Sequence, residues 1–276
     1  MKQAYKLLQV SYEILGEFHP KNLQLLKNIY GQSQRHEAWS CQGHCLLDFA
    51  YREFCNGNFE EAELVYQNAL DKFQKGNDHE GEGFALLLKE QTAYTRGEIP
   101  NTENIQRALR FLLESNQFHH VGDCYGLLAE LAQHQGDYQR ARWLFDQALP
   151  YYDKSRTKLS AATVYQKLAQ LSLLENDLLA AHQSLQLALS KLQGVYLQNA
   201  RNTEARCREL MGDIFLRSEE YDQAFICYAE SLVILEYFEM GGQKQLRKKI
   251  FITLKKQRGV FLNALVSRKT QLEDES

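Results

Sequence analysis

The chain has 276 residues, of which 44% are hydrophobic and 24% are charged, and a chain of this size can bury one or two cores without disulfides or structural metals. Its 32 basic and 35 acidic residues give a formal net charge of −3. That balance argues against a protein covered in positive charge for duplex nucleic acid. There are only three prolines, so little interrupts helix formation and we expect helices to dominate the fold.

The first residues contain no apolar run long enough for a secretory signal, because Gln9, Ser11 and Glu13 interrupt it. No stretch approaches the roughly 20 apolar residues that span a bilayer. The six cysteines are scattered through predicted helices, and in a chain without an export signal such thiols are expected to be reduced and packed. We therefore expect a cytoplasmic protein.

Residues 1–40 contain apolar helical segments that are broken at His19-Pro20. Proline cannot continue a helix, because it lacks the backbone N–H and clashes with the preceding turn. We interpret this region as N-terminal helices that form either a degenerate first repeat or a cap on the array that follows.

A motif then recurs along the chain. It reads GNFEEAELVYQNAL at 57–70, GDYQRARWLFDQAL at 136–149, NDLLAAHQSLQLAL at 176–189 and EEYDQAFICYAESL at 219–232. Each copy has a turn residue or a charge, then an aromatic residue or Leu, then Ala, and it ends in a small residue followed by Leu. The shared alanine returns after about 40 residues or twice that distance, at Ala62, Ala141, Ala181 and Ala224.

The double gap between the first two copies predicts a further copy between them. We place it at 86–109, where Ala108-Leu109 lies one residue out of step and Pro100 sits in the loop. This second repeat is therefore expected to be irregular.

A second pattern precedes each turn. A large residue is followed three positions later by another and then at once by a small one, as in Leu46, Phe49 and Ala50. This spacing places the three residues on one stripe of a helix, where the small residue lets the neighbouring helix approach closely. The pattern returns at Tyr125, Leu128 and Ala129, at Tyr165, Leu168 and Ala169, and in part at Arg208, Met211 and Gly212. Each repeat is therefore predicted to be a helix A, a tight turn and a helix B.

These residues resemble the tetratricopeptide repeat, whose pattern combines a bulky residue, Leu and a small residue with a Gly-x-Tyr turn, Ala, an aromatic residue and Ala. The family repeat has about 34 residues, and the longer period here is similar to that of kinesin light chains and the Rap-type peptide-sensing regulators of bacteria. The resemblance implies an all-α, right-handed superhelical solenoid of antiparallel helix pairs, with about five repeats in residues 41–236. A plain helix bundle would not repeat the motif spacing.

Residues 237–276 are expected to form a basic capping helix and a tail. Residues 244–258 hold seven basic side chains and no acidic one. An apolar stripe accompanies them at Leu246, Ile250, Leu254, Phe261 and Leu265. The pattern is typical of a cap with a solvated basic face, but it also suits an acidic partner, nucleic acid or an anionic membrane. The candidate contacts of this second surface are Lys248, Lys249, Lys255 and Lys256.

Two groups resemble metal ligands but are incomplete. The segment CQGHC at 41–45 offers two cysteines and a histidine, but structural zinc takes two compact ligand pairs and no second pair exists. His120 and Cys124 share a helix face beside His119, without the carboxylate-and-histidine set of an open site. The chain also lacks a Gly-rich phosphate loop, a G-x-S-x-G elbow and an H-E-x-x-H motif. We therefore expect no catalysis, no cofactor and no metal.

In tetratricopeptide arrays the A helices line a concave groove, so the resemblance implies a partner-binding surface there. The expected groove residues are His44, Leu47, Tyr51, Phe54, Phe84, Gln91, Tyr94, Glu130, Gln133, Gln166, Gln170, Arg206, Asp213 and Arg217. The N-terminal half is aromatic, with anchors Tyr51, Phe54, Phe84 and Tyr94, and the C-terminal half is polar. The carboxylate clamp of chaperone-binding members is absent. A competing interpretation is that the N-terminal helices fold back over the anchors and bury them as core.

The residues and the resemblance together predict a non-catalytic scaffold or adaptor that binds a protein or peptide in this groove. A first alternative is a ligand-gated regulator of the Rap type, in which a bound peptide changes the pitch of the superhelix. A second alternative is an adaptor to nucleic acid or an anionic membrane through the basic C-terminal helix, although the net charge makes these partners less expected. No small-molecule substrate is expected, and the pattern specifies no oligomeric state.

Overall fold

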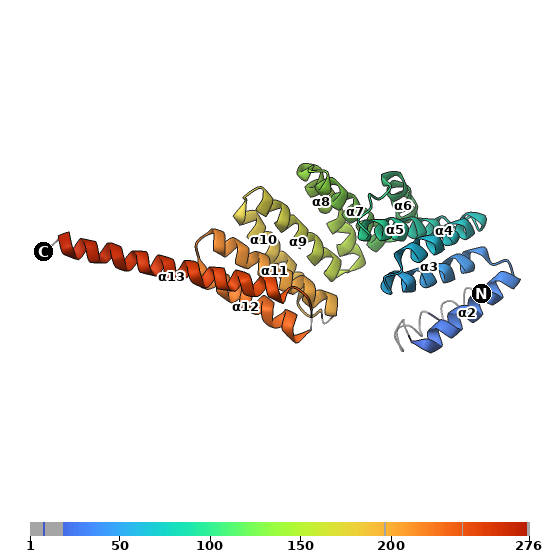
Figure 1. Cartoon of the computed structure of the whole chain (residues 1–276). Coiled ribbons are helices and arrows are strands. Elements are labelled where there is room, and N and C mark those ends of the chain that lie inside the picture. Colours follow the sequence, from blue (N-terminus) through green and yellow to red (C-terminus); the bar gives the residue numbers. More distant parts are fainter. Residues whose placement is uncertain (1–7, 9–18, 196, 239, 275–276) are drawn as a thin grey trace. The chain divides into compact units, whose positions relative to one another are not determined.

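The computed structural model describes residues 8, 19–195, 197–238 and 240–274, with side chains as far as residue 258 except at 198. These residues form twelve α-helices and no strand (Figure 1), so the predicted all-α fold is confirmed. In chain order the helices are α2 (Pro20–Arg35), α3 (Trp39–Cys55), α4 (Phe59–Lys75), α5 (His79–Thr95), α6 (Thr102–Glu114), α7 (Phe118–His134), α8 (Tyr138–Ser155), α9 (Lys158–Leu174), α10 (Leu178–Leu192), α11 (Gln198–Arg217), α12 (Tyr221–Tyr237) and α13 (Gln243–Asp274).

The chain divides into two compact units, residues 1–154 and 155–276. In the first unit α3 packs against α4 and α5 against α6, and in the second α9 packs against α10 and α11 against α12. Each pair is an A helix, a tight turn and an antiparallel B helix, as predicted. The A helices α3, α5, α7, α9 and α11 begin 39 or 40 residues apart, which is the period of the sequence motif.

The turn between an A helix and its B helix is closed by one residue with a left-handed backbone. At Gly57 and Gly136 the φ angles are 82° and 78°, a region where glycine has no Cβ to clash. The next amide then bonds back to the helix end: Asn58 N–H donates to the Glu53 carbonyl at 2.9 Å. The glycines that open two of the motif copies therefore mark the turns.

The small residues predicted at the crossing of each helix pair are buried completely. At three crossings the A helix contributes an alanine, which is the twelfth residue of that helix. The B helix contributes the alanine of the sequence motif. The fully buried residues are Ala50 and Ala62, Ala129 and Ala141, and Ala169 and Ala181, together with Ala224 of the last pair. A methyl side chain lets the two backbones approach closely, which fixes how each pair packs.

The second repeat departs from this rule for a physical reason. The twelfth residue of α5 is Glu90, which is only 4% exposed. Its carboxylate accepts the backbone N–H of Asn101 at 2.6 Å and the side-chain amide of Asn104 at 2.7 Å. A buried carboxylate needs such partners, and here they come from Asn101, the N-cap of α6, and from Asn104 in its first turn. Helix α6 therefore starts late and has only 13 residues.

Aromatic rings of the B helices lie against glycines of the A helices. The Phe73 ring of α4 sits between two glycines, so that a Cβ added at Gly43 or Gly81 would lie 2.6 or 2.2 Å from it. Tyr152 of α8 lies in the same way over Gly122 of α7, where an added Cβ would be 2.6 Å from its ring. These glycines make room for rings that fill the interior between helices.

The N-terminal helix α2 begins at Pro20, so the predicted break at His19-Pro20 is a helix start. The His19 ring accepts the amide of Lys21 at 3.2 Å and caps this end. Leu26 and Ile29 of α2 are buried in one cluster with Cys41 and Cys45 of α3. Residues 1–7 and 9–18 of the predicted N-terminal region, and 275–276 of the tail, lie outside the described residues.

At the other end of the chain, α13 is a helix of 32 residues. Its Leu246 is buried with Leu235 of α12, which ties the start of α13 to the last helix pair. Among the described residues, no helix is both long enough and apolar enough to cross a membrane.

Replacing Gly81 by Ala should lower the free energy of unfolding by about 1–3 kcal/mol. The new methyl would overlap the Phe73 ring, which also lies close to Gly43, so the ring has to shift in a packed interior. The measurement is urea unfolding followed by circular dichroism. The control is Gly31→Ala in α2, where an added Cβ meets no atom within 4 Å, so stability should hold or rise. Equal unfolding midpoints for the two variants would contradict the packing described here.

Candidate binding surfaces

Three A helices of the first unit carry a row of aromatic and histidine side chains, which we call the aromatic row: Tyr51 and Phe54 of α3, Phe84 and Tyr94 of α5, and His120 and His134 of α7. Tyr51 and Phe54 stack with ring centroids 6.4 Å apart. Tyr51 keeps 37% of its surface exposed. Helix α2 packs on the Cys41 and Cys45 side of α3, so this helix does not bury Tyr51.

The row continues from α5 to α7 through two ring contacts. The Phe84 ring meets the His120 ring edge-on at a centroid distance of 4.7 Å. The Tyr94 hydroxyl lies 3.0 Å from Nε2 of His134, and burial raises the pKa of Tyr94 above its usual value. The contact between the Tyr94 hydroxyl and the His134 ring joins α5 to α7.

The first turns of α7 bring two histidines and one carboxylate together. Nε2 of His119 lies 3.6 Å and Nδ1 of His120 lies 3.3 Å from Oδ2 of Asp123. The other oxygen of Asp123 accepts the Tyr152 hydroxyl at 2.9 Å. Among the described residues this is the one group of at least three ligating side chains close enough to hold a metal ion.

The cysteines considered from the sequence do not join that group. Cys124 is completely buried, and burial raises the pKa of its thiol. Cys41 and Cys45 are buried and hydrogen-bonded to each other, and this bond lowers the pKa of Cys41 to about 7. Sequence reasoning paired the two histidines with Cys124, but the helical register puts Asp123 beside them instead.

In the second unit, Lys249 of α13 reaches back to α11. Its ammonium donates to both oxygens of Asp213 at 2.8 Å and lies 2.8 Å from Oε1 of Glu209. Tyr228 of α12 donates its hydroxyl to Asp213 at 2.7 Å, so three helices meet at one carboxylate. Burial lowers the pKa of Lys249, but hydrogen bonds to Asp213 and Glu209 outweigh it and raise the pKa.

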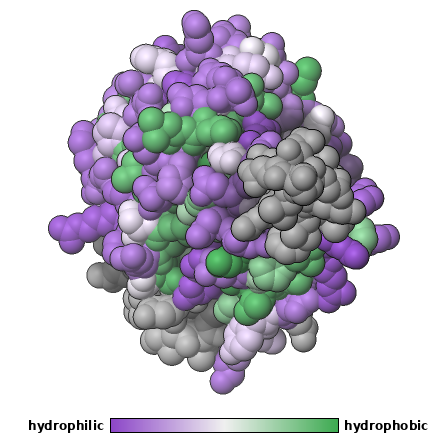
Figure 2. Space-filling view, turned by 90° about the vertical axis from the view of Figure 1, so that its left-hand side faces the viewer, coloured by the Kyte–Doolittle hydropathy of each residue, from purple (hydrophilic) through white to green (hydrophobic). Residues whose placement is uncertain are grey.

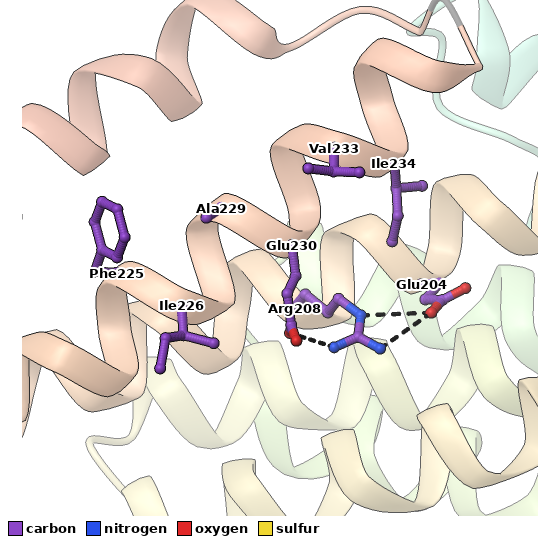
Figure 3. Close-up of a pocket in the computed structure, with 8 residues that line it drawn as sticks. All are labelled: Glu204, Arg208, Phe225, Ile226, Ala229, Glu230, Val233 and Ile234. Atoms are coloured by element: carbon purple, nitrogen blue, oxygen red, sulfur yellow. Dashed lines mark hydrogen bonds and ion pairs between the residues drawn. The ribbon is translucent and has the colours of Figure 1, made fainter.

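Helix α12 forms one wall of a pocket of about 440 Å³. Figure 3 shows its apolar side chains projecting from α12 above Glu204 and Arg208 of α11. Ile226 is 47% exposed and Val233 is 65% exposed. Figure 2 shows several hydrophobic patches on one mostly hydrophilic face of the molecule. An exposed apolar patch next to charged groups is typical of a protein-binding surface.

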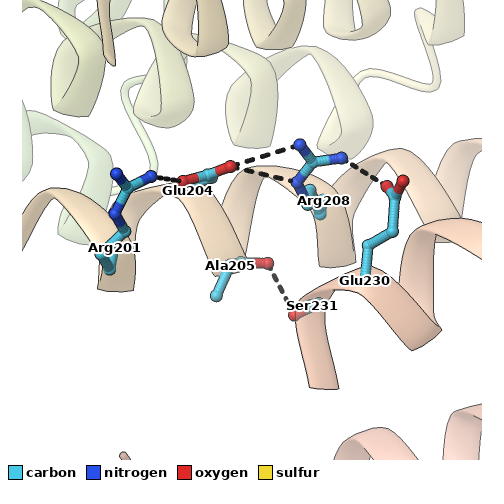
Figure 4. Close-up of polar contacts among 6 residues, drawn as sticks. All are labelled: Arg201, Glu204, Ala205, Arg208, Glu230 and Ser231. Atoms are coloured by element: carbon cyan, nitrogen blue, oxygen red, sulfur yellow. Dashed lines mark hydrogen bonds and ion pairs between the residues drawn. The ribbon is translucent and has the colours of Figure 1, made fainter. Parts of the chain in front are cut away.

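Charges beside this pocket neutralise one another. The carboxylate of Glu204 forms ion pairs with the guanidinium groups of Arg201, at 2.6 Å, and of Arg208, at 3.2 Å. Arg208 also pairs with Glu230 of α12 (Figure 4). Ser231 of α12 donates to the Ala205 carbonyl of α11 at 2.8 Å. The network ties α11 to α12 and leaves the apolar wall as the distinctive feature of the pocket.

The family model described as soluble NSF attachment protein, SNAP, matches residues 50–191, just over half of the chain. The chain belongs to the soluble NSF attachment protein family. Among solved structures, the crystal structure of BtubC (BKLC) from P. vanneervenii is similar with a TM-score of 0.63, over 79% of this chain and 91% of that chain, at 16% identity. At that identity the likeness shows the fold alone. A search of the curated proteins gives no match.

Both findings confirm a tetratricopeptide-like helical repeat in this SNAP-family chain. The subclass with the longer period stays a prediction. The sequence analysis considered His120 only as an incomplete metal ligand and did not predict it as a groove residue, because it falls outside the groove positions carried over from the repeat family. Its position three residues before Asp123 was the available signal, since such residues share a helix face.

The structure also corrects several predicted contact residues. Leu47 is 8% exposed and Gln166 is 4% exposed, because both face the interior between helices, so neither can contact a partner from its present position. Asp213 and Lys249 form an ion pair with each other. The ammonium group of Lys249 is therefore directed at α11, unlike the other predicted lysines of the basic surface. Lys248, Lys255 and Lys256 are exposed on α13.

Replacing Lys249 by Met should lower the free energy of unfolding of this SNAP-family chain by about 1–2 kcal/mol. The change keeps the aliphatic stem but leaves Asp213 and Glu209 without their cation. Urea unfolding measures the effect, and Lys248→Met is the matched control because Lys248 is exposed. If both variants unfold at the same urea concentration, the ion pair does not hold α13 in place.

Proposed function

We propose that this SNAP-family chain is a non-catalytic scaffold or adaptor, acting in the cytoplasm, that binds a protein or peptide along the aromatic row. The observation that carries the proposal is the contact of Phe84 and Tyr94 of α5 with histidines of α7, next to α3, which packs against α5 and exposes Tyr51. Aromatic side chains supply large contact areas at little conformational cost, which makes them frequent hot spots of binding.

The family name supports a protein as the partner. A soluble NSF attachment protein is by its description a protein that attaches to another protein, and helical solenoids commonly use their inner helices for this purpose. Polar side chains beside the aromatic row would supply hydrogen bonds that fix the orientation of a bound segment. In the first unit, the residues predicted for this role and not buried are His44, Gln91, Glu130 and Gln133.

A second binding surface is favoured by the apolar wall of α12. Its apolar residues Ile226 and Val233 are exposed to solvent. The charged residues beside them form ion pairs with one another. Two separate surfaces on one chain would let it connect two partners. The pocket supports an adaptor role in addition to the aromatic row.

Affinity capture from cells of the source organism, followed by direct titration of the captured protein, tests the aromatic row. The double variant Tyr51→Ala/Tyr94→Phe removes the exposed ring and one hydroxyl. It should weaken binding at least about tenfold, as expected for the loss of hot-spot contacts. Circular dichroism checks that the variant is folded.

The matched control is Trp143→Ala on the B helix α8, an aromatic residue that is 57% exposed and outside the aromatic row. It should leave the affinity unchanged. A partner that binds both variants as well as the unaltered chain would overturn the aromatic row as the site. If Val233→Glu alone abolishes binding, the pocket of α12 is the site instead.

A further inference from the structure

We propose that His119, His120 and Asp123 of α7 bind a divalent transition-metal ion of the zinc type. Two imidazoles and one carboxylate are a common protein ligand set for zinc, in which a fourth position stays open. Nothing in the proposed function requires this site, whose ligands lie on α7 and whose neighbours lie on α5 and α8.

The distances from the two histidine nitrogens to the carboxylate oxygen are close to those around a tetrahedral ion. Zinc bonds of about 2.0–2.1 Å to nitrogen and oxygen place neighbouring ligand atoms about 3.3–3.4 Å apart. The nitrogens of His120 and His119 lie 3.3 and 3.6 Å from the same oxygen of Asp123. These distances exceed the usual length of an N–H···O hydrogen bond, so the rings face the carboxylate without being closed onto it.

The ligands are held in place by their neighbours. Tyr152 donates its hydroxyl to Oδ1 of Asp123 at 2.9 Å, which orients the carboxylate and leaves Oδ2 for an ion. The Phe84 ring packs edge-on against His120 at 4.7 Å, and the Tyr152 ring lies 5.8 Å from that of His119. Such second contacts raise metal affinity because less order has to be created on binding.

The two histidines are supported unequally. Nδ1 of His119 is buried without a hydrogen-bond partner in the part of the chain that the structure describes. A metal-bound histidine is normally fixed by a hydrogen bond from its second nitrogen. His120 packs more closely on its aromatic neighbour Phe84, and Asp123 is held by Tyr152, so we expect these two to contribute more affinity than His119.

The open coordination position would lie beside the aromatic row, because His120 contacts Phe84. A histidine or carboxylate of a bound partner could complete the coordination there. This extension rests on the proposed function, whereas metal binding by the chain alone does not. The first experiment therefore uses no partner.

Co²⁺ and Zn²⁺ are titrated into the full-length chain, with the visible absorption of Co²⁺ reporting its coordination and calorimetry reporting stoichiometry and affinity. We expect one ion per chain with a dissociation constant in the micromolar range. Asp123→Asn, which keeps an acceptor for Tyr152, and His120→Gln should each weaken binding about tenfold or more. His119→Gln should weaken it less.

His79→Gln is the matched control, since His79 lies 3.6 Å from Glu82 in another histidine–carboxylate pair, and it should leave the affinity unchanged. Circular dichroism shows which variants are folded. The proposal is overturned if no ion binds below millimolar concentration, or if Asp123→Asn and His120→Gln bind as tightly as the unaltered chain. Ion binding by the cysteines would be recognised by intense cobalt–thiolate absorption and would also overturn it.

Discussion

The close contact between aromatic rings of the B helices and glycines of the A helices is the constraint on which the repeat depends. Phe73, Tyr152 and Tyr228 each occupy space that a single Cβ on the A helix would invade. Together with the alanines at the crossing, these contacts set the separation of neighbouring helices. A regular separation in turn lets side chains of neighbouring A helices meet, as Phe84 of α5 meets His120 of α7.

Where the sequence breaks the repeat, the structure compensates locally. Glu90 replaces an alanine at the crossing in the second pair, and Asn101 and Asn104 at the start of α6 supply its hydrogen bonds. Phe84 and Tyr94 of the same helix contact the histidines of α7. The chain thus tolerates a buried carboxyl side chain in its framework while α5 keeps its contacts with α7.

The framework could be predicted from the sequence because small residues and turn glycines recur at a fixed spacing. Ala62, Ala141 and Ala181 occupy the crossings that the motif predicted. Long-range contacts could not be predicted in this way. The pairing of Lys249 with Asp213 joins residues 36 positions apart, and the meeting of Phe84 with His120 depends on the packing of α5 on α7. Neither contact leaves a periodic trace in the sequence.

Binding of a protein partner by the inner helices of the first unit can be tested by hydrogen–deuterium exchange of the chain, measured with and without a captured partner. We expect slower exchange in the C-terminal turns of α3 and in α5 and α7, with little change in the outer helices α4 and α8. Slower exchange confined to α4, α8 or α13 would show that the partner binds elsewhere.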